Sequence, residues 1–173
     1  MVAMGRKKME YKTEGITLIA LVITIIVLMI LAGIGIYGST DMIKKANLEE
    51  LKTNMLLMQA KAREYVEDAT FKMGINPDEE KKRNVRNAVY SEEAKLRKTV
   101  DSEIPSSFGI TDVTTCYWLT PEAQKAWGLD KIKLEKNEKY LIQFDEANMT
   151  VEIYNTTGYR GNYSLTAINQ INE

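Results

Sequence analysis

The sequence predicts an α+β protein in which one long helix precedes a small antiparallel sheet. Three observations carry this prediction. Residues 16–38 contain no charged side chain. Residues 39–73 are rich in strong helix formers, with apolar side chains at spacings of three and four. Residues 109–173 contain short apolar runs separated by turn residues, as expected for strands and hairpins. We expect the long helix to pack on this C-terminal domain.

Residues 1–15 form a basic leader in front of an apolar helix. The basic residues of the leader are Arg6, Lys7, Lys8 and Lys12, and the acidic ones are Glu10 and Glu14. The uncharged stretch 16–38 exceeds the roughly 20 residues that cross a bilayer core. A cleaved secretory signal would have a shorter apolar region, of about 7 to 15 residues, and an Ala-x-Ala-like site. We therefore expect a single retained membrane span with a cytoplasmic N-terminus and an extracellular C-terminal domain.

Residues 39–73 are expected to extend the same helix as an amphipathic segment. Ser39, Thr40 and Asp41 could interrupt it, but no proline follows them. The apolar face consists of Leu48, Leu51, Met55, Met58, Ala62, Tyr65 and Ala69. We expect this stripe to pack on the chain's own C-terminal domain. A coiled-coil seam is the alternative that the spacing leaves open.

Residues 74–108 are expected to form a variable region of helix and loop. Residues 74–78 (GINPD) stop the first helix and start a second one over the highly charged residues 79–100, which we expect to be exposed. Residues 101–108 form a connector.

Residues 109–173 are expected to form the C-terminal α+β domain. The pattern predicts a strand at 113–119, then a helix capped by Thr120 and Pro121 that ends at Gly128. A hairpin is expected with strands at 139–144 and 149–154, and a last strand at 163–167.

Composition excludes several classes of function. The net charge is only -1, so we expect no direct contact with nucleic acid. The chain has no histidine and a single cysteine, Cys116, which argues against the usual catalytic triads, zinc sites and an internal disulfide. Asp145, Glu146 and Asn148 could be calcium ligands, but their order fits a hairpin turn better. We expect no catalytic residues, no metal and no cofactor, and hence no enzyme.

The junction Glu14-Gly15-Ile16-Thr17-Leu18-Ile19-Ala20, followed at once by the apolar stretch, resembles the cleavage and methylation motif of type IV prepilins and type II secretion pseudopilins. The resemblance implies that a prepilin peptidase cuts after Gly15 and that the new terminal amine of Ile16 is methylated. It also implies a pilin-like fold. Most pilins carry a glutamate at the position of Ala20, where its carboxylate is thought to neutralise the terminal amine of a neighbouring subunit. Alanine at this position resembles pilin-like proteins of Gram-positive bacteria.

The resemblance implies a structural subunit of a type IV pilus-like or pseudopilus filament, with Thr17, Leu18, Ile19 and Ala20 inside the motif. Its implied partners are the peptidase, membrane lipid, like or related pilin subunits, an assembly platform protein and an ATPase. Such a filament could serve adhesion, motility, DNA uptake or secretion. The alternative is a single-pass surface protein that stays in the membrane and binds a partner through its C-terminal domain. Ala20 favours that alternative, because an unpaired terminal amine is costly in an apolar helix bundle.

Overall fold

The computed structural model describes the backbone of residues 14–171 and, within that range, the side chains of residues 20–29 and 41–171. The chain divides into two compact units, residues 1–45 and residues 46–173. Most of the predicted leader lies outside the described residues.

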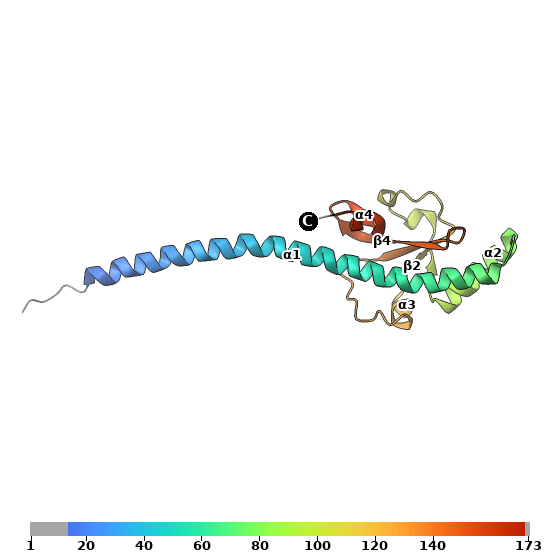
Figure 1. Ribbon diagram of the computed structural model, residues 1–173, viewed down its shortest axis with the longest axis horizontal. Helices are drawn as coiled ribbons and strands as arrows, with labels where there is room; N and C mark the ends of the chain where they lie inside the picture. The colour runs from blue at the N-terminus through green and yellow to red at the C-terminus, as the bar shows by residue number, and fades with distance from the viewer. Residues whose placement is uncertain (1–13, 172–173) are drawn as a thin grey trace, which may run out of the picture. The chain divides into compact units, whose positions relative to one another are not determined.

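Helix α1 (Glu14–Met73) is the longest element and runs without interruption through Ser39, Thr40 and Asp41, as expected (Figure 1). It ends where the sequence places a stop. Gly74 has φ +71°, a left-handed conformation that glycine adopts without steric cost. Asp78 then caps helix α2 (Glu79–Arg86) by accepting a hydrogen bond from the amide of Lys81 at 2.7 Å.

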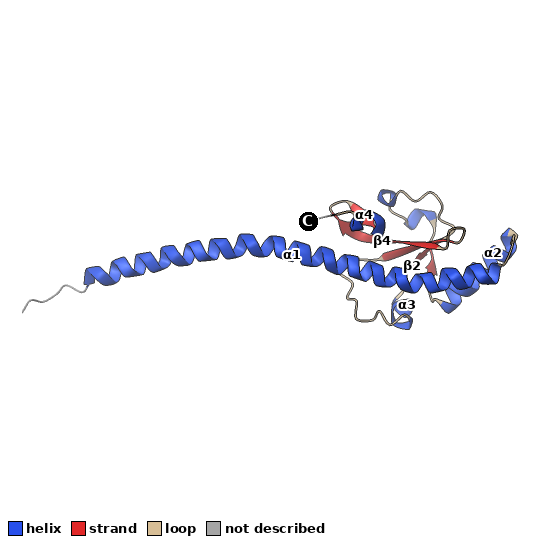
Figure 2. Ribbon diagram, viewed as in Figure 1, coloured by secondary structure: helices blue, strands red, loops and turns tan. Residues whose placement is uncertain are grey.

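The second unit is built around a five-stranded antiparallel sheet with strand order β1-β2-β3-β4-β5 (Figure 2). The strands are β1 (Arg97–Lys98), β2 (Cys116–Trp118), β3 (Tyr140–Asp145), β4 (Thr150–Tyr159) and β5 (Asn162–Ser164). The fold class, α+β with a long helix and an antiparallel sheet, is therefore confirmed. The expected hairpin is also confirmed, since β3 and β4 pair in register from Tyr140 with Asn155 to Asp145 with Thr150.

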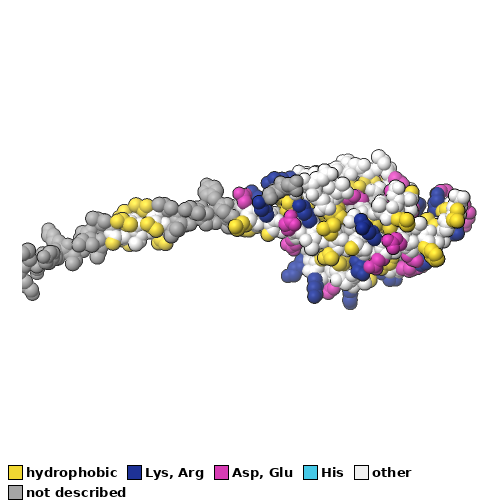
Figure 3. Space-filling view, viewed as in Figure 1, with side chains coloured by type: hydrophobic (Ala, Val, Ile, Leu, Met, Phe, Trp, Pro, Cys, Tyr) yellow, Lys and Arg dark blue, Asp and Glu magenta, His cyan; other side chains and the backbone are white. Residues whose placement is uncertain are grey.

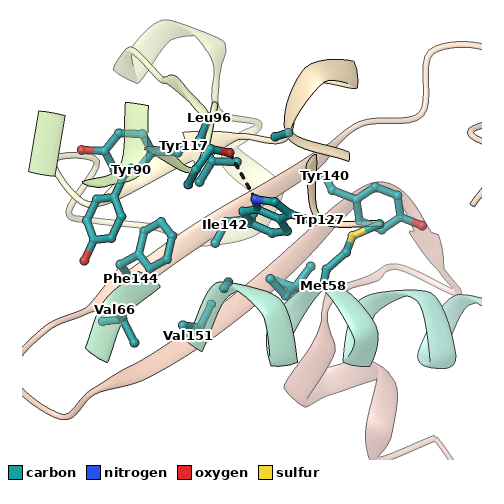
Figure 4. Close-up of a cluster of buried hydrophobic side chains, with 14 of the residues drawn as sticks. Met58, Val66, Tyr90, Leu96, Tyr117, Trp127, Tyr140, Ile142, Phe144 and Val151 are labelled. Carbon is teal, nitrogen blue, oxygen red and sulfur yellow. Dashed lines mark hydrogen bonds between the residues drawn. The ribbon is translucent and has the colours of Figure 1, made fainter. Parts of the chain in front are cut away.

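One face of the sheet packs on the part of α1 that belongs to this unit. Alternation along β3 turns Tyr140, Ile142 and Phe144 to the same face. These side chains share a core with the helix residues Leu48, Met55, Met58, Ala62, Val66, Ala69 and Met73 (Figure 4). The predicted stripe thus packs on the chain's own domain. The expected members Leu51 and Tyr65 are only partly buried, while Val66 and Met73 are buried members that the pattern missed.

The opposite face of the sheet is covered by the segment between β1 and β2. This segment contains two short 3-10 helices, η2 (Asp101–Glu103) and η3 (Ser106–Phe108). Phe108 lies against Cys116, Trp118 and Leu141 in a second, smaller core. Its ring stacks on Tyr154, with ring centroids 5.1 Å apart.

The prediction of one exposed helix over residues 79–100 is wrong in its second half. Helix α2 has no buried residue, but it gives way to a π-helix, η1 (Asn87–Glu93), and then to β1. The wider turn allows the adjacent residues Val89 and Tyr90 both to be buried. Ala94 and Leu96 follow them into the core. The few apolar residues of this charged segment therefore belong to the hydrophobic core of the domain.

The predicted strands 113–119 and 163–167 are shorter in the structure. Strand β2 covers only Cys116–Trp118. Strand β5 ends at Ser164 because the Ser164 hydroxyl accepts the amide of Ala167 at 3.2 Å and starts helix α4 (Leu165–Asn169). The capping prediction at Thr120 is confirmed, with its hydroxyl accepting the amide of Ala123 at 3.0 Å at the start of α3 (Pro121–Ala126).

Candidate functional site: the start of helix α1

The predicted cleavage junction lies in the first turn of α1. The helix begins at Glu14, so Gly15, Ile16, Thr17, Leu18 and Ile19 have helical backbone, but their side chains lie outside the described residues. The first amides of a helix have no partner within it. The bond after Gly15 is therefore at the end of the helix that opens most easily.

Ala20 is the one residue of the motif whose side chain is described, and it is exposed. Its methyl group supplies no carboxylate. Within residues 20–29 there is no charged side chain, and Thr24 bonds its hydroxyl back to the carbonyl of Leu21 at 2.7 Å. This segment therefore offers only apolar surface and one self-satisfied hydroxyl.

The large apolar side chains of residues 20–29 are all exposed, and because successive residues of a helix point in different directions, they cover every side of it. Figure 3 shows part of this apolar surface on the face in view. The exposed fractions of these side chains range from 44% for Ile25 to 70% for Met29. The set comprises Leu21, Val22, Ile23, Ile25, Ile26, Val27, Leu28 and Met29. A helix that is apolar all round is normally covered by a membrane or by other helices.

Among the residues that the structure describes, no helix is both long enough and apolar enough to span a bilayer. The predicted span at 16–38 includes residues 16–19 and 30–38, whose side chains lie outside the described set. The membrane span stays a prediction.

In the hairpin turn that was considered as a calcium site, the carboxylates of Asp145 and Glu146 already have partners within the protein. Asp145 accepts the backbone amide and the side-chain amide of Asn148, at 3.1 and 2.7 Å. Glu146 instead forms a bidentate ion pair with Arg86, at 2.8 and 2.6 Å. Within the described part of the chain, no group of three histidine, cysteine, aspartate or glutamate residues is arranged to hold a metal ion.

A hollow of about 660 Å³ in the second unit lies between the end of α1, α2 and the β3–β4 turn. Its cations are already paired, Arg86 with Glu146 and Lys82 with Glu79 at 2.6 Å. Of its other carboxylates, Asp112 bonds Thr114 and Glu152 bonds Thr166. These contacts indicate a structural role for the groups around this hollow.

The cysteine is placed for packing and not for chemistry. Cys116 is fully buried on β2, and burial together with the nearby charge of Asp112 raises the pKa of its thiol to about 12. A thiol in this state carries almost no thiolate at neutral pH.

Comparison with known proteins finds no match to this chain among family models, curated proteins or solved structures.

Proposed function

We propose that this chain is a structural subunit of a type IV pilus-like or pseudopilus filament, processed by a prepilin peptidase after Gly15. The observation that carries the proposal is the all-round apolar surface of residues 20–29, which follows the Gly15-Ile16 junction directly. Half-exposed aliphatic side chains gain about 1 kcal/mol each when they are covered, so the eight together provide several kcal/mol for association.

Two different environments would cover this apolar surface, one before assembly of the filament and one during assembly. Before assembly, membrane lipid would surround the helix, with the leader in the cytoplasm and the second unit outside. During assembly, a platform protein and an ATPase would draw the subunit from the bilayer, and the helices of like or related subunits would replace the lipid. In this function the helix acts by polymerising, with the second unit displayed on the outside.

The processing step is tested by substitution at the junction. Gly15→Phe places a bulky side chain at the scissile bond, and we expect the uncut chain to accumulate in the native host. Gly5→Phe, the same change within the leader but away from the junction, is the matched control and should be cut normally. Mass spectrometry of the N-terminal peptide would show a chain beginning at methylated Ile16 in the wild type and in the control. Normal cleavage of the Gly15 variant would contradict the proposal, as would an uncut wild type in a host that has the peptidase.

A second candidate is a membrane-anchored surface protein that binds a partner without polymerising. The exposed Ala20 favours it, because no carboxylate is available there to pair with a neighbour's terminal amine. The two candidates differ in where the processed chain is found. A filament subunit is released with the surface fraction when cells are sheared, whereas an anchored protein stays with the membranes.

A further inference from the structure

A second hollow in the globular unit, of about 270 Å³, is lined by hydrogen-bond donors without a carboxylate among them. It lies where α2 and the π-helix η1 meet the start of the sheet. The lining residues are Arg83, Asn84, Asn87, Ser91, Lys98 and Tyr117.

The backbone register brings two of these groups together. Lys98 on β1 pairs directly with Tyr117 on β2. Directly opposed residues of an antiparallel pair project to the same face of the sheet. Arg83, from the last turn of α2, completes a set of two cations and a phenol drawn from three elements.

Tyr117 has an unused hydroxyl although its side chain is almost entirely buried. The residue is 1% exposed, yet its hydroxyl has no hydrogen-bond partner among the described residues. The ring is held in place by edge contacts to Tyr90 and Phe144, with ring centroids 5.2 and 5.8 Å away. In Figure 4 Tyr117 lies beside Tyr90 at the margin of the aromatic cluster. Tyr117 lines the hollow, and its hydroxyl keeps contact with solvent, because no buried side-chain oxygen among the described residues lacks a partner.

The two cations that line the hollow, Arg83 and Lys98, also have no carboxylate partner among the described residues. Within the described part of the chain, Arg83 and Lys98 form no salt bridge, whereas the nearby Arg86 is neutralised by Glu146. Asn87 donates its amide to Glu92, a carboxylate that does not itself line the hollow. Two positive charges thus face this space without a negative one.

We propose that this hollow binds a phosphate group, with Arg83 and Lys98 supplying charge and Tyr117 and Ser91 supplying hydroxyl donors. A guanidinium fork matches the oxygens of a phosphate, and a lysine adds a point charge. Burial raises the pKa of Tyr117 to about 12, so its hydroxyl keeps its proton and can donate at neutral pH. The volume admits a phosphate and a small attached group.

The site is tested by phosphate titration of the purified full chain in detergent, with sodium chloride matched for ionic strength. Wild type should bind inorganic phosphate with a dissociation constant of about 1 mM or tighter, seen by calorimetry and as a rise in the unfolding temperature with phosphate concentration. Titration with glycerol phosphate distinguishes the source. Binding of the ester as well indicates a phosphate carried on a larger molecule, and binding of inorganic phosphate alone indicates the free ion.

Tyr117→Phe is the decisive variant, because it removes only a hydroxyl that has no partner. We expect unchanged or slightly higher stability without phosphate, and about tenfold weaker phosphate binding. Arg83→Gln and Lys98→Gln should weaken binding at least as much. Their matched controls, Arg63→Gln and Lys131→Gln, remove exposed cations outside the hollow and should bind as the wild type does. Absence of phosphate binding in the wild type would overturn the proposal. So would phosphate binding by Tyr117→Phe and the cation variants that is as tight as that of the wild type.

Discussion

Met58 tests whether the amphipathic part of α1 is held by its own domain. Its side chain is fully buried against the sheet, whereas that of the preceding residue, Leu57, is 47% exposed. Met58→Ala removes three buried heavy atoms and leaves a cavity, which costs about 3 kcal/mol. Leu57→Ala removes a half-exposed side chain of similar size and should cost about 1 kcal/mol or less.

The assay is thermal and urea unfolding of the full chain in detergent, followed by circular dichroism and tryptophan fluorescence. Trp127 stacks on Tyr65 of α1 with ring centroids 5.3 Å apart, so its emission reports separation of the helix from the domain. We expect Met58→Ala to lower the unfolding temperature by roughly 10 °C and Leu57→Ala by a few degrees at most. Equal losses in the two variants would refute the packing argument. An unfolding midpoint that rises with protein concentration would indicate the coiled-coil seam instead.

Two further predictions concern the sheet. The buried Cys116 thiol, whose pKa is raised to about 12, should react with iodoacetamide at pH 8 on the order of a thousandfold more slowly than in urea. Because folding raises this pKa, the thiol's contribution to stability is complete below about pH 8.5 and is lost as the pH rises toward 12, which alkaline unfolding would show. Native alkylation at the urea rate would contradict the burial. Gly158→Ala should destabilise the domain by more than about 2 kcal/mol, because the added Cβ would lie 2.5 Å from the carbonyl oxygen of Asn162 at a left-handed φ of +61°. Gly128→Ala has a similar φ of +71° with nothing within 4 Å, so it should show only the backbone penalty, about 1 kcal/mol, in the same urea titration.

The elements predicted best are those whose signals are local. The break at Gly74, the cap at Thr120 and the turn from Asp145 to Asn148 each depend on a few neighbouring residues, and each lies where the sequence places it. The apolar face of residues 39–73 could also be predicted, because its spacing of three and four repeats over several turns of the helix. Its exact members were less certain, since Tyr65 and Val66 are adjacent and only the sheet decides which of them is buried.

The parts that were missed depend on contacts between distant segments. Residues 87–96 were predicted to belong to an exposed helix because, over the whole segment 79–100, charged residues outnumber apolar ones. Tyr90 is nevertheless buried because Phe144, more than fifty residues later, stacks on it with ring centroids 3.9 Å apart. The phosphate-site residues Arg83, Lys98 and Tyr117 likewise form no sequence motif. The net charge of the chain gave no indication of them, since a near-neutral total can contain a locally positive hollow.

Helix α1 changes its pattern of burial along its length, and this change bears most directly on function. Over residues 46–73 the apolar side chains at spacings of three and four form one face, and the domain's own core buries that face. Over residues 20–29 no polar face exists and the described side chains are exposed all round. A stripe of Lys or Glu in that segment would have made it a water-facing helix, and a one-sided pattern would have suited a single partner. An apolar surface on every side suits an environment that surrounds the helix, which both lipid and a bundle of like helices provide. The proposed filament uses these two environments in succession, and the leader junction at Gly15 is where the sequence places the change from one to the other.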